Sequence, residues 1–365
     1  MGIESKPPTD ARRRPRSVMD GALHACAMSF SDGGRHTRVT EVDAVAAATA
    51  GDEAAFGELA ERFRHELQVH CYRLLGSFED AEDLVQETFL RAWRKRGSFR
   101  GRSTFRAWLY GIATNACLDA LERRPRRTHE AGVPPPEADL PWLQPFPDRL
   151  LDGIATSDAE PDAVVVAKET IELAFIVAIQ QLPARQRAVL IVRDILGWSA
   201  QETASLLEAS VASVNSALQR ARATLKKHLP ERRLEWAPGS DPSEAERALL
   251  ERYMEAHERA DATALAALLR EDALQTMPPE PSWYAGREAV AGLAREFFVS
   301  DFGHMRCLLT RANRQPAVAI YLRKPDDAAH RPMALDVLRV EGGLVAEITT
   351  FVPELFPAFA LPATL

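Results

Sequence analysis

The sequence has few cysteines and no long apolar run. Its four cysteines stand singly, with no C-x-x-C pair, so they form neither a zinc ligand set nor a disulfide framework. No apolar stretch approaches the ~20 residues that a membrane-spanning helix needs. The arginine-rich start also lacks the apolar core of a signal peptide. These absences predict a cytoplasmic protein that uses no membrane, metal or cofactor.

Charge is unevenly distributed along the chain. The formal net charge is −7, which argues at first against a nucleic-acid partner. However, ten Lys or Arg and only two acids lie between Arg94 and Arg127. From Asp241 to Leu365, nineteen acids face thirteen bases. Because binding to a polyanion depends on where positive charge clusters, the first stretch can contact DNA and the last third is a poor candidate.

A chain of 365 residues is too long for one ordinary core, and its 24 prolines indicate linkers between domains. The predicted segments are a disordered tail (1–43), a helical domain (44–128), a Pro-rich linker (129–168), a second helical domain (169–230), a short linker (231–243) and an α+β domain (244–361). The Pro-rich linker carries apolar residues such as Trp142, Leu143 and Phe146, which a purely flexible tether does not need.

The first informative motif runs from Asp80 to Trp93. Helical spacing brings its acidic residues close to Arg91 and aligns its apolar residues in a stripe alongside. The pattern by itself also fits an ordinary amphipathic helix. Gly76 and Ser77 supply the break before it, with Ser77 as the helix cap.

The second motif runs from Phe99 to Asp119 and mixes basic with aromatic residues. A protein that binds single-stranded DNA uses this mixture, because cations follow the phosphates while aromatic faces accept unstacked bases. Some members also fit a core-facing helical stripe, and we expect Trp108 and Ile112 to be structural.

The third motif runs from Leu182 to Arg222. Ser199 and Glu202 form a capping box that opens a short helix, residues 208–210 make a turn, and a second helix follows from Ser213. This is helix-turn-helix geometry, in which the second helix enters the major groove and its later basic residues meet phosphates.

In this order, the three motifs resemble the extracytoplasmic-function RNA polymerase sigma factors, over about residues 44–229. The resemblance implies that the first helix docks on the β′ clamp helices of core RNA polymerase, with the β subunit as a further partner. The residues that it assigns to polymerase binding are Asp80, Asp83, Leu84, Val85, Gln86, Glu87, Phe89 and Trp93.

The same resemblance implies two promoter contacts. The second motif resembles the element that opens the minus-10 region and captures a flipped base of the non-template strand. The residues that it assigns there are Arg100, Arg102, Ser103, Phe105, Arg106, Trp108 and Asn115. The third motif resembles sigma region 4, which binds the minus-35 element. The residues assigned to that contact are Ser210, Ala212, Ser213, Asn215, Ser216, Gln219, Arg220 and Arg222. In this family the linker threads polymerase channels, which would explain the apolar residues between Pro141 and Asp152.

The last domain has a different pattern. A helix is predicted over 244–270 and a short one after Gly286, followed by strands over 317–322, 334–340 and 344–351. This part resembles the SnoaL-like fold, an α+β cone-shaped domain. With the two all-α sigma domains it gives a multidomain fold of the subgroup typified by mycobacterial sigma factor G. Enzymes of this fold use an Asp/His pair, for which His257, His304 and Asp336 are available without a clear pairing.

The sequence therefore predicts a sigma factor, not an enzyme, whose C-terminal domain modulates its activity. That domain packs against the sigma domains or the linker, with a small molecule or a protein as a possible regulator. The alternatives are a helix-turn-helix regulator that works without core polymerase and a SnoaL-like enzyme with a DNA-binding appendage. Fold alone does not separate these functions.

Overall fold

The computed structural model describes residues 41–101, 103–123, 140–151, 171–228, 243–298 and 303–365. The predicted tail (residues 1–40), Arg102, most of the Pro-rich linker and the second linker thus lie outside the described residues. The described chain divides into two compact units, and the boundary between them in the sequence follows Glu61.

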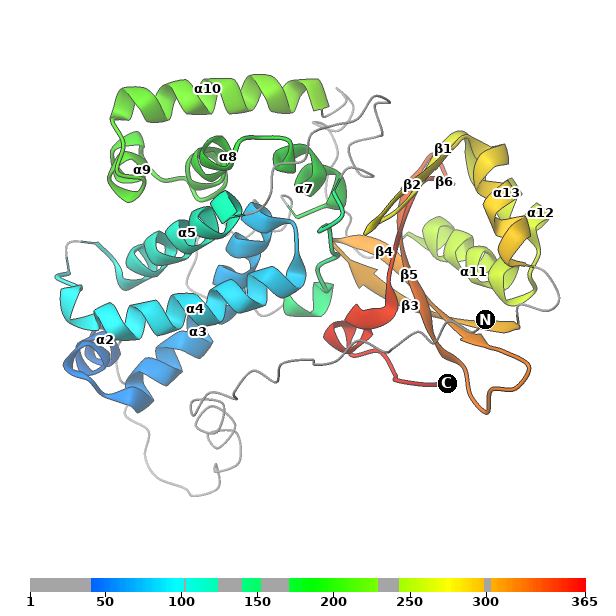
Figure 1. The fold of residues 1–365 in the computed structure, drawn as a ribbon, viewed down its shortest axis with the longest axis horizontal. Helices are drawn as coiled ribbons and strands as arrows, with labels where there is room; N and C mark the ends of the chain where they lie inside the picture. Colours follow the sequence, from blue (N-terminus) through cyan, green and yellow to red (C-terminus); the bar gives the residue numbers. More distant parts are fainter. Residues whose placement is uncertain (1–40, 102, 124–139, 152–170, 229–242, 299–302) are drawn as a thin grey trace, which may run out of the picture. The chain divides into compact units, whose positions relative to one another are not determined.

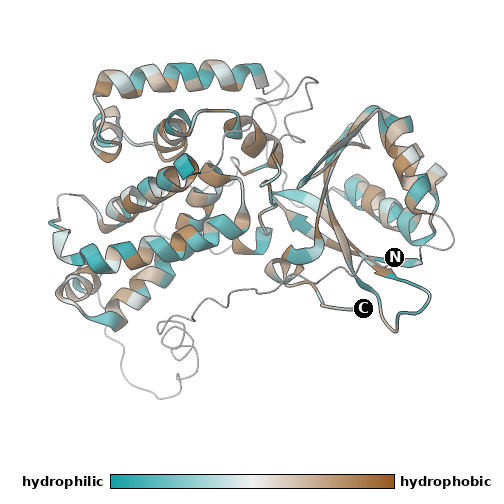
Figure 2. Cartoon of the chain, in the orientation of Figure 1, coloured by the Kyte–Doolittle hydropathy of each residue, from teal (hydrophilic) through white to brown (hydrophobic). Residues whose placement is uncertain are grey.

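The N-terminal half is helical (Figure 1). Its helices are α2 (Glu41–Ala50), α3 (Glu53–Leu75), α4 (Phe78–Lys95) with the short turn η2 (Arg96–Ser98), and α5 (Phe105–Arg123). Ser77 caps α4 by accepting a hydrogen bond from the Asp80 amide at 3.2 Å. The predicted break and its cap are therefore confirmed. Figure 2 shows hydrophobic residues alternating with hydrophilic ones along α4, as expected for a helix that is buried on one side.

The second helical block begins after the described linker segment, which contains η3 (Asp148–Leu150). It comprises α7 (Leu173–Gln180), α8 (Ala184–Leu190), the π-helical turn η5 (Ile191–Ile195), α9 (Ala200–Leu206) and α10 (Val211–His228). Both halves of the predicted capping box between Ser199 and Glu202 are formed. Helices α9 and α10, with the tight turn between them, form the predicted helix-turn-helix.

The C-terminal domain is a mixed sheet with helices on one face (Figure 1). Its helices are α11 (Glu244–Glu258), α12 (Ala262–Ala267) and α13 (Arg287–Phe297). Its strands are β1 (Leu269–Met277), β2 (Glu280–Ala285), β3 (His304–Ala312), β4 (Gln315–Arg323), β5 (Arg331–Glu341) and β6 (Leu344–Phe351), followed by η7 (Pro353–Phe359). The strand order is β2-β1-β6-β5-β4-β3, and only the β1–β6 pair is parallel.

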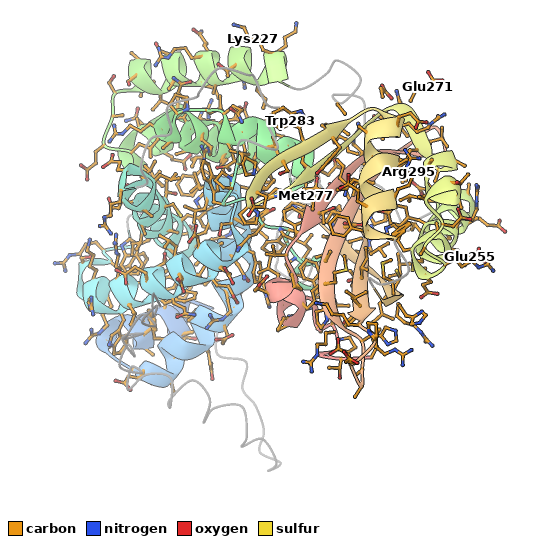
Figure 3. All side chains as sticks on the ribbon, turned by 45° about the vertical axis from the view of Figure 1, so that its right-hand side comes forward. Lys227, Glu255, Glu271, Met277, Trp283 and Arg295 are labelled. Atoms are coloured by element: carbon orange, nitrogen blue, oxygen red, sulfur yellow. The ribbon has the colours of Figure 1, made fainter. Side chains whose placement is uncertain are left out.

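The core of this domain lies between the helices and the sheet. Leu250 and Tyr253 of α11, Val290 of α13 and Ile348 of β6 are all buried in it. Figure 3 labels two charged residues of the outer surface, Glu255 and Arg295, and both are exposed. The sheet is curved (Figure 1), and its inner face lines a cavity on the side of the helices.

The helix predicted over 244–270 is wrong in its length. It ends at Glu258, because Ala260 adopts a left-handed φ of 53° and Asp261 caps a separate helix. The Asp261 side chain accepts hydrogen bonds from the amides of Thr263 and Ala264. Leu269 then begins a strand that the sequence pattern does not predict. The strands predicted over 317–322, 334–340 and 344–351 are confirmed as β4, β5 and β6.

Candidate functional site

Helix α4 carries the residues predicted to bind polymerase, and they divide between its core and its surface. Val85 and Phe89 are buried, with 1% and 8% of their surface exposed. Their side chains therefore pack within the protein itself. The remaining members are exposed or half-buried: Asp80, Asp83, Leu84, Gln86, Glu87 and Trp93.

An ion-pair network connects the surface of α4 to α5. The Arg91 Nε atom lies 2.8 Å from Glu87, and its Nη1 atom lies 3.0 Å from Asp119. These hydrogen bonds raise the pKa of the Arg91 guanidinium above its usual value. The network thus connects the surface of α4 to α5, although each exposed pair adds at most about 1 kcal/mol.

The residues predicted for the minus-10 contact lie on α5 and the segment before it. Phe99, Phe105 and Trp108 form an aromatic cluster with ring centroids 5.4 to 5.6 Å apart. Phe105 is buried and Trp108 is half-buried, so this cluster supports the helix as well as offering an aromatic surface. The exposed polar members around it are Arg100, Ser103, Arg106 and Asn115.

Arg106 already has protein partners. Its Nε atom lies 2.8 Å from Glu66 Oε2, and its guanidinium lies 4.9 Å from the centroid of the Tyr110 ring. Burial raises the pKa of Glu66, and the neighbouring Arg106 acts in the opposite direction. A phosphate contact by Arg106 would therefore compete with Glu66 for the same guanidinium.

The residues predicted for the minus-35 contact share one surface of the helix-turn-helix. Val214, Leu218 and Ala221 fasten α10 to its own domain, with no more than 6% of their surface exposed. The eight predicted contact residues are all exposed: Ser210, Ala212, Ser213, Asn215, Ser216, Gln219, Arg220 and Arg222. The Arg222 guanidinium forms a two-pronged ion pair with Asp194. The small polar residues precede the basic ones along α10, as major-groove readout requires.

Most apolar residues of the linker segment 140–151 are buried within this chain, and Trp142 and Leu150 are half-buried. Leu143 and Phe146 have at most 2% of their surface exposed, and the Phe146 ring packs on Tyr72 and Phe78 with centroids 5.0 and 5.6 Å away. The Gln144 side chain accepts hydrogen bonds from Ser77 and from the Glu79 amide. In this structure the anchors thus have partners inside the protein, which differs from the explanation by polymerase channels.

The turn between β3 and β4, Ala312–Gln315, holds this linker segment; we call it the Asn313 turn. Asn313 is fully buried and has a left-handed φ of 54°. Its Oδ1 accepts a hydrogen bond from the Phe146 amide at 2.7 Å, and its Nδ2 donates to the Tyr72 hydroxyl and the Ile171 carbonyl. One side chain thereby contacts α3, the linker and the start of the second helical block.

Neighbouring residues extend the contacts of the Asn313 turn. The buried Asp148 carboxylate accepts hydrogen bonds from the Arg314 amide at 2.8 Å and from Arg311 at 3.2 Å. Burial raises the pKa of Asp148, while these donors act against that rise. Gln315 accepts a hydrogen bond from the amide of Leu173, the first residue of α7. The C-terminal domain thus packs against both the linker and the second helical block.

A buried arginine joins the two helical domains. Arg187 on α8 is 5% exposed, and its guanidinium donates to the carbonyls of Leu74 on α3 and of Leu182, and to Gln180. Gln180 in turn donates to the Arg73 carbonyl. These bonds satisfy carbonyls at the C-terminal end of α3, which have no partner within that helix.

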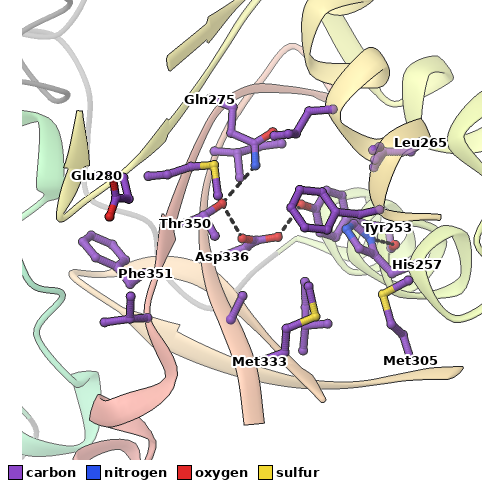
Figure 4. A pocket seen from close by; sticks show the side chains of 18 of the residues that line it. Tyr253, His257, Leu265, Gln275, Glu280, Met305, Met333, Asp336, Thr350 and Phe351 are labelled. Carbon is purple, nitrogen blue, oxygen red and sulfur yellow. Dashed lines mark hydrogen bonds between the residues drawn. The ribbon is translucent and has the colours of Figure 1, made fainter. Parts of the chain in front are cut away.

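The C-terminal domain contains a cavity of about 410 Å³. Most of its lining is apolar, including Leu265, Met305, Phe298 and Ile348. Five residues form its polar end: Tyr253, His257, Gln275, Asp336 and Thr350 (Figure 4). The structure therefore brings His257 and Asp336 into one cavity. His304 is exposed on β3 and does not line it.

Hydrogen bonds connect the residues of the polar end. The Tyr253 hydroxyl donates to Asp336 Oδ2 at 2.9 Å, and the Thr350 hydroxyl donates to Asp336 Oδ1 at 2.7 Å. Gln275 donates to Thr350 at 3.0 Å. Burial raises the pKa of Asp336 and lowers the pKa of His257. Both shifts favour the uncharged forms of these groups.

Sequence reasoning missed most of this polar end and all of the Asn313 turn. Tyr253 and His257 are four residues apart, so helical spacing on α11 could have paired them. Thr350 and Asp336 meet because β5 and β6 pair at that register. Within the described residues, no cluster of His, Cys, Asp or Glu could hold a metal ion, and no helix is long and apolar enough to cross a membrane.

The fold and these surfaces define a sigma factor with an added C-terminal domain. The family models for Sigma-70 region 2 match residues 59–127, those for Sigma-70 region 4 match residues 172–225, and the SnoaL-like domain matches residues 250–348. The predicted combination of fold and family is confirmed.

Similar proteins identify the family more closely. The chain is 38% identical to the ECF RNA polymerase sigma factor SigG of Mycobacterium tuberculosis over 366 residues, covering 95% of this chain and 96% of the relative. It is 36% identical over 199 residues to SigM of the same species, covering 54% of this chain and 88% of SigM. The crystal structure of M. tuberculosis SigJ shares the fold, with a TM-score of 0.52 at 22% identity, covering 84% of this chain and 99% of SigJ. The chain belongs to the extracytoplasmic-function RNA polymerase sigma factors.

Proposed function

We propose that this sigma factor docks on the β′ clamp helices through the accessible surface of α4. In the proposal, the segment around Phe99 and Trp108 holds the separated minus-10 strand, and α10 reads the minus-35 element. The bounds of the six predicted segments and a cytoplasmic location belong to the same proposal. Its main support is the exposure of all eight predicted residues on the helix-turn-helix, together with the accessible acidic and apolar residues of α4.

The docking step has a direct test. Leu84→Ala together with Trp93→Ala removes apolar side chains from the accessible part of α4, and we expect a loss of at least tenfold in affinity for core polymerase. The measurement is co-purification and titration with core enzyme. Leu309→Ala, which removes an exposed apolar side chain in the C-terminal domain, is the matched control. Unchanged binding by the double variant would contradict the docking surface.

We further propose that the C-terminal domain modulates the sigma domains and carries no catalytic activity. The observation that supports this proposal is that the Asn313 turn contacts α3, the linker and the second helical block at once. Arg187 adds a direct connection between α8 and α3. A sigma factor must place its two DNA-reading domains on separate promoter elements, so these contacts favour a closed state that opens on polymerase.

Run-off transcription with purified core enzyme tests the modulation. Asn313→Leu weakens the closed state, and we expect it to change the yield of transcript several-fold at limiting sigma factor. Lys324→Leu alters an exposed residue of the next loop and is the control. Equal transcript yields from wild type and Asn313→Leu would remove the modulatory proposal and leave the sigma function intact.

A further inference from the structure

The polar end of the C-terminal cavity has an acceptor that the protein does not use. The Nδ1 atom of His257 lies 2.9 Å from the Tyr253 carbonyl oxygen, which has no hydrogen to donate, so Nδ1 carries the proton. In the neutral ring, Nε2 is then an acceptor. Among the described residues, the ring makes its one hydrogen bond through Nδ1, and Nε2 makes none. The ring lines the cavity and meets Phe298 edge-on at 5.3 Å.

The other members of the polar end are engaged with one another, but they retain accepting capacity. Each oxygen of Asp336 receives one hydrogen bond and has a second lone pair available. Figure 4 shows Asp336 between Thr350 and Tyr253, with a hydrogen bond to each. A bound molecule that donates one hydrogen bond at this end would therefore find acceptors in place.

Charge at the cavity narrows the class of molecule. Among its described lining residues, the ionisable groups besides Tyr253 are His257, Asp336 and Glu280, and none is Lys or Arg. An anionic ligand would be buried without a cationic partner and beside carboxyl groups, which is costly. A buried ammonium would lose its hydration shell, and both oxygens of the nearest carboxyl group, Asp336, already receive a hydrogen bond from Tyr253 or Thr350.

The rest of the cavity wall is mostly apolar and favours a large apolar ligand. Three methionines, Met277, Met305 and Met333, line it together with Phe297 and Phe298. Methionine side chains adapt their shape and make favourable contacts with aromatic rings. A volume of about 410 Å³ lies within the range of sites that enclose small organic molecules.

We infer that this cavity binds an uncharged, largely apolar molecule of one or more rings that carries a hydroxyl group at one end. The hydroxyl donates to His257 Nε2 or to Asp336. This inference deepens the proposed modulation by the C-terminal domain, and its regulatory consequence rests on that proposal. Binding of the ligand would affect transcription through the C-terminal domain, which contacts the linker at the Asn313 turn.

A matched probe series tests the inference on the full chain. The probes are 2-naphthalenemethanol, 2-ethylnaphthalene, 2-naphthoate and 2-(aminomethyl)naphthalene, titrated calorimetrically at pH 7. We expect the alcohol to bind about tenfold more tightly than the ethyl compound, because one hydrogen bond to a buried acceptor is gained. The anion and the ammonium should both bind more weakly than the alcohol.

Variants locate the binding. In His257→Phe, which keeps a ring at the same place, the advantage of the alcohol over the ethyl compound should fall to about twofold or less if Nε2 is the acceptor. Asp336→Leu removes the other acceptor and tests the Asp336 side in the same way, whereas Thr350→Val removes only a donor to Asp336 and should leave the advantage of the alcohol in place. Thr349→Val is the matched control, because Thr349 is adjacent on β6 and does not line the cavity. Circular dichroism checks that each variant is folded.

Three results would overturn the inference: binding of the anion or the ammonium at least as tight as that of the alcohol, equal binding of the alcohol and the ethyl compound, or no binding of the alcohol to the folded wild-type chain. An alcohol preference that survives both His257→Phe and Asp336→Leu would also overturn it. These assays contain no polymerase, whereas the modulatory proposal is tested by transcription with Asn313→Leu. The two can therefore fail separately.

Discussion

The Asn313 turn and the polar end of the cavity are two buried polar networks in one domain, and they differ in how completely the protein satisfies them. Asn313 bonds to partners up to 241 positions away in the chain. Each of its side-chain polar atoms has a protein partner. At the cavity, by contrast, His257 leaves one ring nitrogen without a hydrogen bond among the described residues.

This difference separates a structural joint from a binding site. A side chain whose donors and acceptors are all satisfied, as in Asn313, holds segments together and gains nothing from a ligand. A network with an unused acceptor beside an apolar cavity gains a hydrogen bond when a suitable molecule arrives. Variants in each network should therefore have different kinds of effect.

Asn313→Leu should have the largest effect. The change leaves the Phe146 amide and the Ile171 carbonyl without their partner and puts a branched side chain at a left-handed φ. We expect the joint to lose about 3 kcal/mol. Hydrogen exchange of the segment 140–151 measures the loss, with Lys324→Leu as the control. If exchange in this segment is unchanged, the turn does not hold the linker.

His70 has a buried imidazole that does not line the cavity, and its protonation should have the next largest effect on stability. Its Nε2 lies 2.9 Å from the Thr114 hydroxyl, and burial lowers its pKa to about 3. Between pH 6.5 and about 3, the unfolded chain binds a proton that the folded chain does not, so stability falls as pH falls. At pH 5 the expected loss is about 2 kcal/mol relative to pH 7.

Urea unfolding at pH 7 and pH 5 measures this loss in wild type and in His70→Gln. Buried carboxyl groups with raised pKa, such as Glu66, change stability in the opposite direction. Both proteins share those groups, so the difference between them isolates His70. An identical pH dependence in the two proteins would show that His70 is not the source.

Thr350→Val should have the smallest effect on stability. It removes the hydroxyl that donates to Asp336 and accepts from Gln275, and we expect a loss of about 1 kcal/mol because water can enter the cavity and replace the bond. Thermal unfolding compares it with Thr349→Val. A loss as large as that of Asn313→Leu would mean that the polar end is as closed as the joint, and the comparison would fail.

Local signals allowed much of the fold to be predicted from the sequence. The cap at Ser77, the capping box at Ser199 and the strand over 344–351 depend on residues close together in the chain, and all three are confirmed. The break at Ala260 was missed because helical periodicity continues past it. Propensity cannot reveal a left-handed residue that is fixed by its surroundings.

The functional sites also differ in how well the sequence predicts them, according to whether their residues lie close together in the chain. Exposure of the predicted residues on α10 follows from its own periodicity, so sequence reasoning could group them. His257 and Asp336 come from different elements, and only the sheet register and the packing of α11 bring them together. Asn313 gives no local signal at all, since its partners lie on α3, the linker and Ile171.

The position of Asn313 after the helix-turn-helix in the chain also has a consequence for synthesis. A ribosome completes the helix-turn-helix at His228 before it adds the strands that form the turn. At ordinary translation rates, the residues from there to Gln315 take on the order of ten seconds. During that interval, a growing chain has both promoter-reading domains without the turn that joins them. Newly made molecules thus pass through a brief stage in which the Asn313 turn does not yet restrain these domains.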